Sequence, residues 1–211
     1  MLTIILTTAI ILGVLYLLHM VTFPRGHVTS VNSGHALCVV DMLNGFMPWG
    51  ELPVPDGDKV VDYINDLLLD VEDVCFDTSI AVCDAHPADS DHFQKFPPHC
   101  IKGTKSAEFV DGLLTELISD VFYKGTKKDE DGFSGATPEV IHFLRREGIH
   151  VVTVVGVATE YCVRATAIGL REAGFKVRVL LDGCKALTPE AEAEATQDMR
   201  SRGITVIDRE A

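Results

Sequence analysis

The segment VVTVVGVATEYCV, residues 151–163, decides the fold. Residues 151–155 are β-branched throughout, which predicts a strand buried on both faces. Residues 159–173 then predict a helix that ends at Gly174. A buried strand that leads directly into a helix is half of a βαβ unit, in which the chain crosses back over a parallel sheet.

The same alternation extends along the chain on both sides of this segment. Thr137 and Pro138 supply an N-cap and a first helical residue, which places the start of one helix closely. Strands are predicted at 36–41, 79–84, 120–124, 151–155, 176–181 and 204–207, and helices at 60–71, 109–118, 137–146, 159–173 and 189–201. The pattern predicts an α/β fold, a parallel β-sheet covered by helices on both faces.

The N-terminal segment differs in composition from the rest. Residues 1–24 contain no Asp, Glu, Lys or Arg, and residues 2–22 are long enough as a helix to span a bilayer core of about 30 Å. We therefore predict a hydrophobic helix and membrane anchor at 1–22, a linker at 23–34 and one folded domain at 35–211. Arg25 follows the span and favours a single-pass protein with its folded domain in the cytosol. A signal peptide, or a cytoplasmic protein with a misassigned start, is the alternative.

Net charge and cysteine spacing bear on the partners and on the redox compartment of the protein. The chain has 211 residues, with 18 Lys and Arg against 31 Asp and Glu, so its formal net charge is −13. This balance argues against a nucleic-acid partner, which needs a basic surface for phosphates. The six cysteines form no C-x-x-C pair and agree with a reducing compartment.

Four reactive side chains fall where the predicted strands end. They are Asp41, Asp84, Lys124 and Cys162. Parallel α/β sheets bind ligands at the carboxyl ends of their strands, so we expect these four groups to meet there. Cys162 lies in the first turn of its helix, where backbone N–H groups and the helix dipole lower a thiol pKa. A nucleophilic Cys with Asp41 as its base is one interpretation, and a merely buried helix cysteine is the other.

Three histidines follow the second strand end within fourteen residues. Asp84 and His86 are two apart on extended chain, which places both side chains on one side. His92 and His99 follow in the next loop. Imidazole and carboxylate are ligands for zinc, iron(II) or manganese, so we predict a metal site. Surface loops also carry histidine by chance, and that remains the alternative.

Taken together, these motifs resemble one family of enzymes. The motifs are VVDMLNGF at 39–46, CDAH at 83–86, FPPHC at 96–100, VFYKG at 121–125 and VGVATEYCV at 155–163. In this order they resemble the nicotinamidases, also called pyrazinamidases, of the isochorismatase-like cysteine hydrolases. The resemblance covers the chain from about residue 36 to its end, which makes 35–211 an isochorismatase-like hydrolase domain.

The resemblance implies a role for each matching residue. The implied catalytic triad is Asp41, Lys124 and Cys162, and the implied metal ligands are Asp84, His86 and His99, with His92 as a fourth. Phe46 and Phe96 are implied to flank the substrate ring. The backbone of Ala158 and Cys162 is implied to bind the oxyanion, after a cis Val157–Ala158 bond. One divalent metal is implied, zinc first, with iron or manganese as alternatives. Relatives often have Gln, Asp, Tyr and Phe where Leu43, Gly45, Phe133 and Ala136 stand, which leaves the ring preference open.

The activity implied is hydrolysis of nicotinamide, and also of pyrazinamide, to the acid and ammonia through a cysteine thioester. The partner is then a small aromatic amide, with the membrane at residues 1–22; a homo-oligomer stays open. Two alternatives remain from the sequence: another amide or ureide hydrolase of the superfamily, or a membrane-tethered metal-binding module without turnover.

Overall fold

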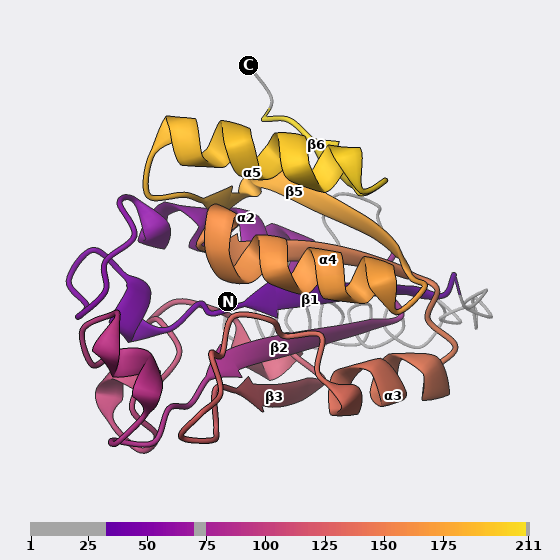
Figure 1. Ribbon diagram of the computed structural model, residues 1–211. Helices are drawn as coiled ribbons and strands as arrows, with labels where there is room; N and C mark the ends of the chain where they lie inside the picture. The colour runs from indigo at the N-terminus through magenta and orange to yellow at the C-terminus, as the bar shows by residue number, and fades with distance from the viewer. Residues whose placement is uncertain (1–32, 70–74, 210–211) are drawn as a thin grey trace, which may run out of the picture. The chain divides into compact units, whose positions relative to one another are not determined.

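A computed structural model describes residues 33–69 and 75–209 of the chain. The unit Asn32–Ala211 is built on one six-stranded sheet in the order β3-β2-β1-β4-β5-β6, and every neighbouring pair of strands is parallel (Figure 1). The strands are β1 His35–Val40, β2 Thr78–Asp84, β3 Asp120–Lys124, β4 Val151–Val157, β5 Lys176–Lys185 and β6 Thr205–Ile207. The predicted parallel α/β fold is confirmed.

Helices cover both faces of this sheet, as predicted. They are α2 Val61–Leu68, α3 Pro138–Arg146, α4 Arg164–Glu172 and α5 Pro189–Ser201. In Figure 1, α3, α4 and α5 lie in front of the sheet and α2 lies behind it. Right-handed crossovers require this division, because the chain moves toward β3 in its first half and toward β6 in its second.

Local signals in the sequence position two of these helices. The hydroxyl of Thr137 accepts a hydrogen bond from the Val140 N–H at 3.3 Å, and Pro138 opens α3. The hydroxyl of Thr188 accepts from the Ala191 N–H at 3.1 Å ahead of α5. Each cap satisfies one amide that the first helical turn would otherwise leave without a partner.

The core lies between the sheet and its helices. All six residues of β1 are buried, and so are the last six of β4. Strands buried on both faces consist of apolar, mainly β-branched residues, which explains why these two segments stand out in the sequence. β1 and β4 are also neighbours at the centre of the sheet, so the polar residues that follow them are held on a rigid support.

The helix predicted at 109–118 does not form. Phe109 pairs with Leu43 as an isolated antiparallel bridge, and only Thr115–Leu117 makes a single 3₁₀ turn. Gly112 has φ +91°, which interrupts a helix, and Asn65 bonds to the carbonyl of Gly112 and the N–H of Leu114. Side-chain bonding from α2 thus replaces the helical bonds that the apolar spacing suggested.

The membrane prediction is corrected by the structure. In the part of the chain that the structure describes, no helix has the length and apolar composition to cross a bilayer. The longest described helix, α5, has 13 residues and reaches about 20 Å, well short of the roughly 30 Å of a bilayer core. The prediction of single-pass anchoring with a cytosolic domain, made from the uncharged apolar span and Arg25, is corrected by this finding. The hydrophobic helix predicted at 1–22 and the linker at 23–34 lie outside the described residues, apart from 33–34.

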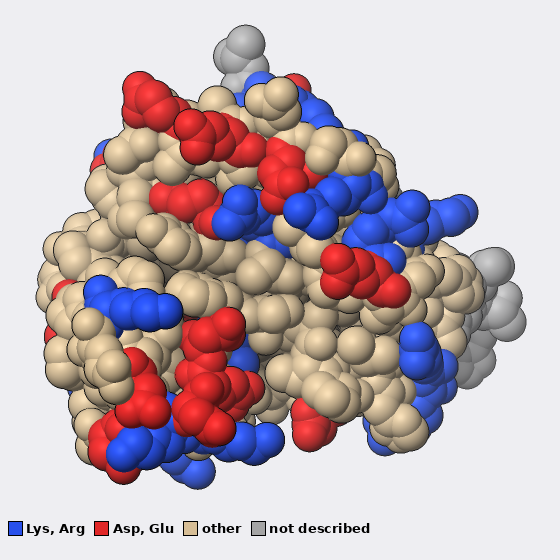
Figure 2. All heavy atoms as spheres, viewed as in Figure 1, with Lys and Arg blue, Asp and Glu red and all other residues tan. Residues whose placement is uncertain are grey.

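The negative charge is spread over the surface in groups. On the face shown in Figure 2, groups of acidic side chains lie next to basic ones, with wide areas of other residues between the groups.

Candidate active site

The site lies at the carboxyl ends of four adjacent strands, β3, β2, β1 and β4. Asp41 follows β1, Asp84 ends β2, Lys124 ends β3, and Cys162 lies just after β4. The chain order reverses between β1 and β4, which is the position where open α/β sheets bind ligands. Asp84 and Lys124 are direct neighbours in the register of β2 and β3, so their side chains start side by side.

Lys124 is the centre of the buried charges. Its ammonium lies 2.7 Å from Asp41 Oδ2 and donates to Asp84 Oδ1 at 2.6 Å and to the Gly132 carbonyl at 2.7 Å. It also lies 3.5 Å from the sulfur of Cys162. Burial alone would lower the pKa of Lys124, but the two carboxylates hold it well above its usual value. The ammonium is therefore a fixed positive charge next to the sulfur.

Asp41 is held in a single orientation by its backbone and its neighbours. Its φ is +53°, a left-handed conformation that is uncommon outside glycine. Its Oδ1 accepts from the Asp84 N–H at 2.9 Å, while Oδ2 contacts Lys124. Burial raises the pKa of Asp41 and Lys124 opposes that effect, with the result at about 6. Asp41 is thus ionised at neutral pH and basic enough to accept a proton.

Cys162 is buried in a π-helical turn, Thr159–Val163, that precedes α4. One atom each from Asp41, Asp84 and Cys162 lie within 4.8 Å of one another. Burial raises the pKa of the Cys162 thiol well above its usual value, although Lys124 favours the thiolate. This direction differs from the sequence expectation of a lowered pKa, which considered the helix start and not the burial of Cys162. A base is therefore needed to ionise this thiol.

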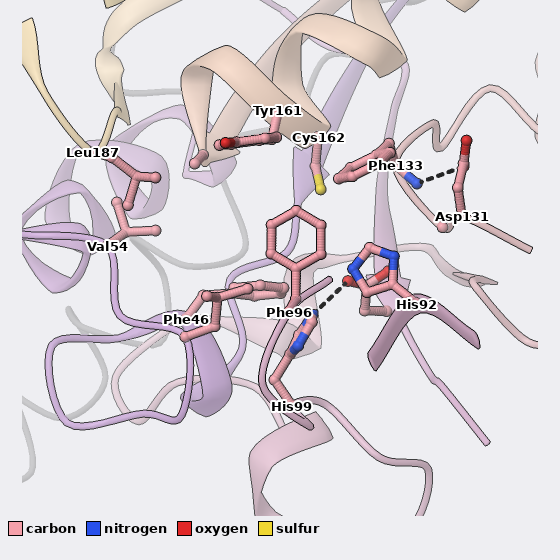
Figure 3. Close-up of a pocket in the computed structure, with 14 residues that line it drawn as sticks. Phe46, Val54, His92, Phe96, His99, Asp131, Phe133, Tyr161, Cys162 and Leu187 are labelled. Atoms are coloured by element: carbon pink, nitrogen blue, oxygen red, sulfur yellow. Dashed lines mark hydrogen bonds and ion pairs between the residues drawn. The ribbon is translucent and has the colours of Figure 1, made fainter. Parts of the chain in front are cut away.

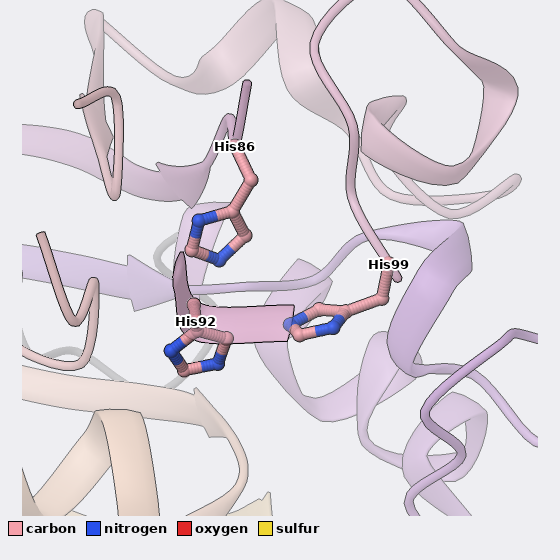
Figure 4. Close-up of side chains that lie close together, drawn as sticks. All are labelled: His86, His92 and His99. Carbon is pink, nitrogen blue, oxygen red and sulfur yellow. The ribbon is translucent and has the colours of Figure 1, made fainter. Parts of the chain in front are cut away.

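His86, His92 and His99 point at one another from three positions along the loop after β2 (Figure 4). One ring nitrogen of each lies within 4.8 Å of the other two. Burial lowers the pKa of His92 to about 4 and also lowers that of His99. Both rings are therefore neutral at pH 7, which is the form that binds metal.

Asp84 connects the histidines to the buried charges. Its Oδ2 lies 3.4 Å from His86 Nε2 and 3.8 Å from His99 Nε2, while its Oδ1 faces Lys124. Burial alone would raise the pKa of Asp84, but Lys124 and His86 together hold it at about 2. The carboxylate therefore offers a charged oxygen to the histidine cluster at any physiological pH.

The histidine cluster fits a divalent metal ion. His86 Nδ1 is buried without a hydrogen-bond partner among the described residues, and Nε2 has only the Asp84 carboxylate at 3.4 Å, which is costly for a polar ring unless something else binds it. His99 Nδ1 bonds to the Pro97 carbonyl at 2.7 Å, and this interaction fixes the tautomer that leaves Nε2 free for a ligand. Three imidazoles and one carboxylate are the donor types that zinc prefers.

A pocket lined mainly by apolar side chains opens beside the sulfur. Figure 3 shows the sulfur of Cys162 pointing toward Phe96, with Tyr161 and Phe133 on either side. The lining residues are Phe46, Leu52, Val54, Asp84, His92, Phe96, His99, Asp131, Gly132, Phe133, Ala158, Tyr161, Cys162 and Leu187. Aromatic walls next to a nucleophile suit a flat, uncharged ring. The bond between Val157 and Ala158, a residue that lines this pocket, is cis as expected.

Residues 35–211 match the isochorismatase domain family. The chain belongs to the isochorismatase family. Its similarity to a nicotinamidase/pyrazinamidase of Mycobacterium tuberculosis is 34% identity over 184 residues, covering 82% of this chain and 97% of that protein.

Solved structures of isochorismatase-family relatives agree with this assignment. A pyrazinamidase of Pyrococcus horikoshii in complex with zinc is 38% identical, with a TM-score of 0.76 over 83% of this chain and 99% of the other. The yeast nicotinamidase Pnc1p bound to the inhibitor nicotinaldehyde is 28% identical, with a TM-score of 0.76 over 83% of this chain and 100% of the other.

The structure of this isochorismatase-family chain brings all the sequence-predicted site residues together. The strand-end residues surround Lys124, and the metal-ligand candidates adjoin them. Sequence reasoning missed the pocket walls contributed by Leu52, Val54, Asp131, Gly132, Tyr161 and Leu187. Tyr161 could have been found from its place beside Cys162; the other five lie on loops that carry no periodic signal.

Proposed function

We propose that this isochorismatase-family enzyme hydrolyses nicotinamide to nicotinate and ammonia through a thioester on Cys162. The observation that carries the proposal is the buried Asp41–Lys124–Cys162 group, of which Cys162 lines an aromatic pocket beside the cluster of three histidines. The chain's similarity to nicotinamidases and pyrazinamidases over most of its length supports the same substrate.

The pocket would hold the pyridine ring between aromatic side chains. Phe46 and Phe96 are the walls that we assign to the ring, with Phe133 and Tyr161 completing the enclosure. Asp84, His86, His92 and His99 would hold a divalent metal, and we assign zinc from the donor set and from the zinc-bound relative. A zinc ion bound there supplies a Lewis acid that attracts the ring nitrogen and so helps to orient the carboxamide toward the sulfur.

Acylation begins with proton transfer from the thiol of Cys162 to the carboxylate of Asp41. The sulfur then attacks the carboxamide carbon, and the carbonyl electron pair moves to oxygen. We assign the backbone N–H groups of Ala158 and Cys162 to stabilise this oxyanion. Asp41 returns its proton to the amide nitrogen, the C–N bond breaks, and ammonia leaves a thioester behind.

Deacylation uses the same groups in reverse roles. Asp41 takes a proton from a water molecule, whose oxygen attacks the thioester carbon. The C–S bond breaks, the proton passes from Asp41 to sulfur, and the acid is released with the thiol restored. The balance is one amide and one water consumed for one acid and one ammonia. Lys124 keeps Asp41 in its charged form between proton transfers and stays protonated itself.

Ammonia release from purified protein tests this proposal. We expect nicotinamide and pyrazinamide to be hydrolysed, whereas an N-carbamoyl amino acid, which is neither flat nor aromatic, should be a poor substrate for a pocket walled by aromatic rings. Cys162→Ala should remove turnover, and Cys75→Ser, at an exposed position, is the matched control. Release from the carbamoyl compound but not from nicotinamide would refute the assignment.

A further inference from the structure

Three consecutive residues, Asp131–Gly132–Phe133, lie beside the buried lysine, the histidine cluster and the aromatic wall of the proposed site. All three line the pocket, yet they lie on the loop between β3 and α3 rather than at a strand end. Residues 126–129, just before them, are exposed, so this stretch gains little support from packing on its upstream side.

Gly132 touches both the catalytic charge and the histidine cluster. Its carbonyl accepts from the Lys124 ammonium at 2.7 Å and so adds an uncharged oxygen to the two carboxylates there. A Cβ on Gly132 would lie 2.8 Å from His86 Cε1, and its φ is +72°. The backbone of Gly132 therefore fills a space in which a side chain does not fit, and its position determines where Lys124 points.

Phe133 is the central ring of the aromatic wall. It stacks on Tyr161 with centroids 5.8 Å apart and packs edge to face on His92 at 5.3 Å and on Phe96 at 5.9 Å. A displaced Phe133 would loosen three of the rings around the substrate at once.

Asp131 holds these two residues in place. Its Oδ1 accepts from the Phe133 N–H at 3.2 Å, the bond drawn at the right of Figure 3. A carboxylate that bonds the N–H two residues ahead forms an Asx turn, which fixes the peptide between them. Downstream, Ser134 donates to the Ala165 carbonyl and the Gly135 N–H donates to Thr166 Oγ1, which ties the loop to α4.

We propose that Asp131 is a positioning residue for amide hydrolysis: its Asx turn holds the Gly132 carbonyl on Lys124 and the Phe133 ring in the pocket wall. It acts through these neighbours, and its role depends on the hydrogen-bond acceptor rather than on the negative charge. The proposal rests on the proposed function, because the turn serves a site that hydrolyses aromatic amides.

The test compares Asp131→Ala with Asp131→Asn, since Asn keeps an acceptor oxygen for the turn and lacks the charge. We expect Asp131→Ala to raise KM for nicotinamide and to lower kcat/KM by about fivefold or more, the factor that corresponds to one net hydrogen bond. Asp131→Asn should stay close to wild type. Asp129→Ala, at an exposed position of the same loop, is the control.

Amide hydrogen exchange over residues 131–136 gives a second measurement that needs no substrate. Asp131→Ala should accelerate exchange in this segment, and Asp131→Asn should retain the protection. Normal kinetics in Asp131→Ala, or equal impairment in both variants, would overturn the proposal. If the wild type releases no ammonia from nicotinamide, the proposed function fails, whereas the exchange result still decides whether the turn holds the loop.

Discussion

Asp41 and Cys162 are both buried, and the pKa of the carboxyl group stays below that of the thiol. The pKa of Asp41 is raised to about 6, and that of Cys162 lies well above its usual value. At rest the proton therefore sits on sulfur, and the carboxylate is free to take it when an amide arrives. Lys124 keeps the pKa of Asp41 from rising further, because its ammonium touches the carboxylate.

The pKa of Asp41 predicts an acid limit on the rate. As the pH falls through about 6, Asp41 becomes protonated and loses the ability to accept the thiol proton. We expect kcat/KM for nicotinamide to be constant near neutral pH and to fall about tenfold per pH unit well below that value. Initial rates of ammonia release across this range measure it. A rate that stays flat down to pH 4 would contradict the assignment of Asp41 as the base.

Removing that base should cost most of the activity. Asp41→Asn keeps the size of the side chain but cannot accept the proton, so we expect kcat to fall by about 10²–10⁴-fold. Asp58→Asn, outside the proposed site, is the control. Circular dichroism shows whether the variant is folded, and a folded Asp41→Asn enzyme with normal turnover would remove Asp41 from the mechanism.

Lys124 should also contribute to the free energy of unfolding, because it neutralises two buried carboxylates. Lys124→Ala leaves two buried carboxylates without their cation, a change that costs about 3–5 kcal/mol of unfolding free energy. Lys59→Ala removes an exposed ion pair with Asp56 and should change stability very little. Denaturant unfolding of the two variants separates the cases. Equal stability for both would mean that the charges around Lys124 are not buried in solution.

At the scale of elements, the loops after the strands determine how the metal-ligand candidates are spaced. Gly125 follows β3 with φ +64°, and a Cβ there would lie 2.5 Å from His86 Cε1. Gly103 has φ +81° in a neighbouring loop, but nothing lies within 4 Å of the position that a Cβ would take there. The two glycines share a left-handed backbone and differ in their contact with His86.

This pair gives a prediction with an internal control. Gly125→Ala and Gly103→Ala should each lose about 1–3 kcal/mol of stability from the left-handed backbone. Only Gly125→Ala should also weaken metal binding, because it displaces His86. Zinc titration of the two purified variants distinguishes them. Equal zinc affinity in both would show that His86 does not depend on this close packing.

Sequence reasoning worked best for elements with their own local signals. The predicted bounds of α5 match the observed ones, because Thr188 and Pro189 mark its start, and β3 matches as well. The strand ends located Asp41, Asp84 and Lys124 because parallel strands share an edge. The differences lie where distant residues take part: Asn65 bonds to the loop at 112–114 where a helix was predicted, and burial raises the pKa of Cys162 where the sequence predicted a lowered one.

At the scale of the whole molecule, the metal-ligand candidates lie beyond the carboxyl ends of the strands and outside the main apolar core. The core is formed by β1, β4 and their flanking helices, and a domain of this size does not need a metal to fold. Treatment with a chelator should therefore abolish ammonia release while the far-ultraviolet circular dichroism stays native. Zinc added back should restore turnover. Full activity of protein shown to be metal-free would contradict the proposed role of the histidine cluster.

The central claim is that Cys162 forms a covalent acyl intermediate with the substrate. Its most direct test is rapid acid quenching of enzyme during turnover of nicotinamide, followed by mass spectrometry of the peptide that contains Cys162. The mechanism predicts a fraction of this peptide heavier by one nicotinoyl group in place of the thiol hydrogen, absent in Cys162→Ala and unchanged in Cys75→Ser. Turnover of nicotinamide with no acylated peptide at any quench time, and with the Cys162→Ala enzyme still active, would contradict it.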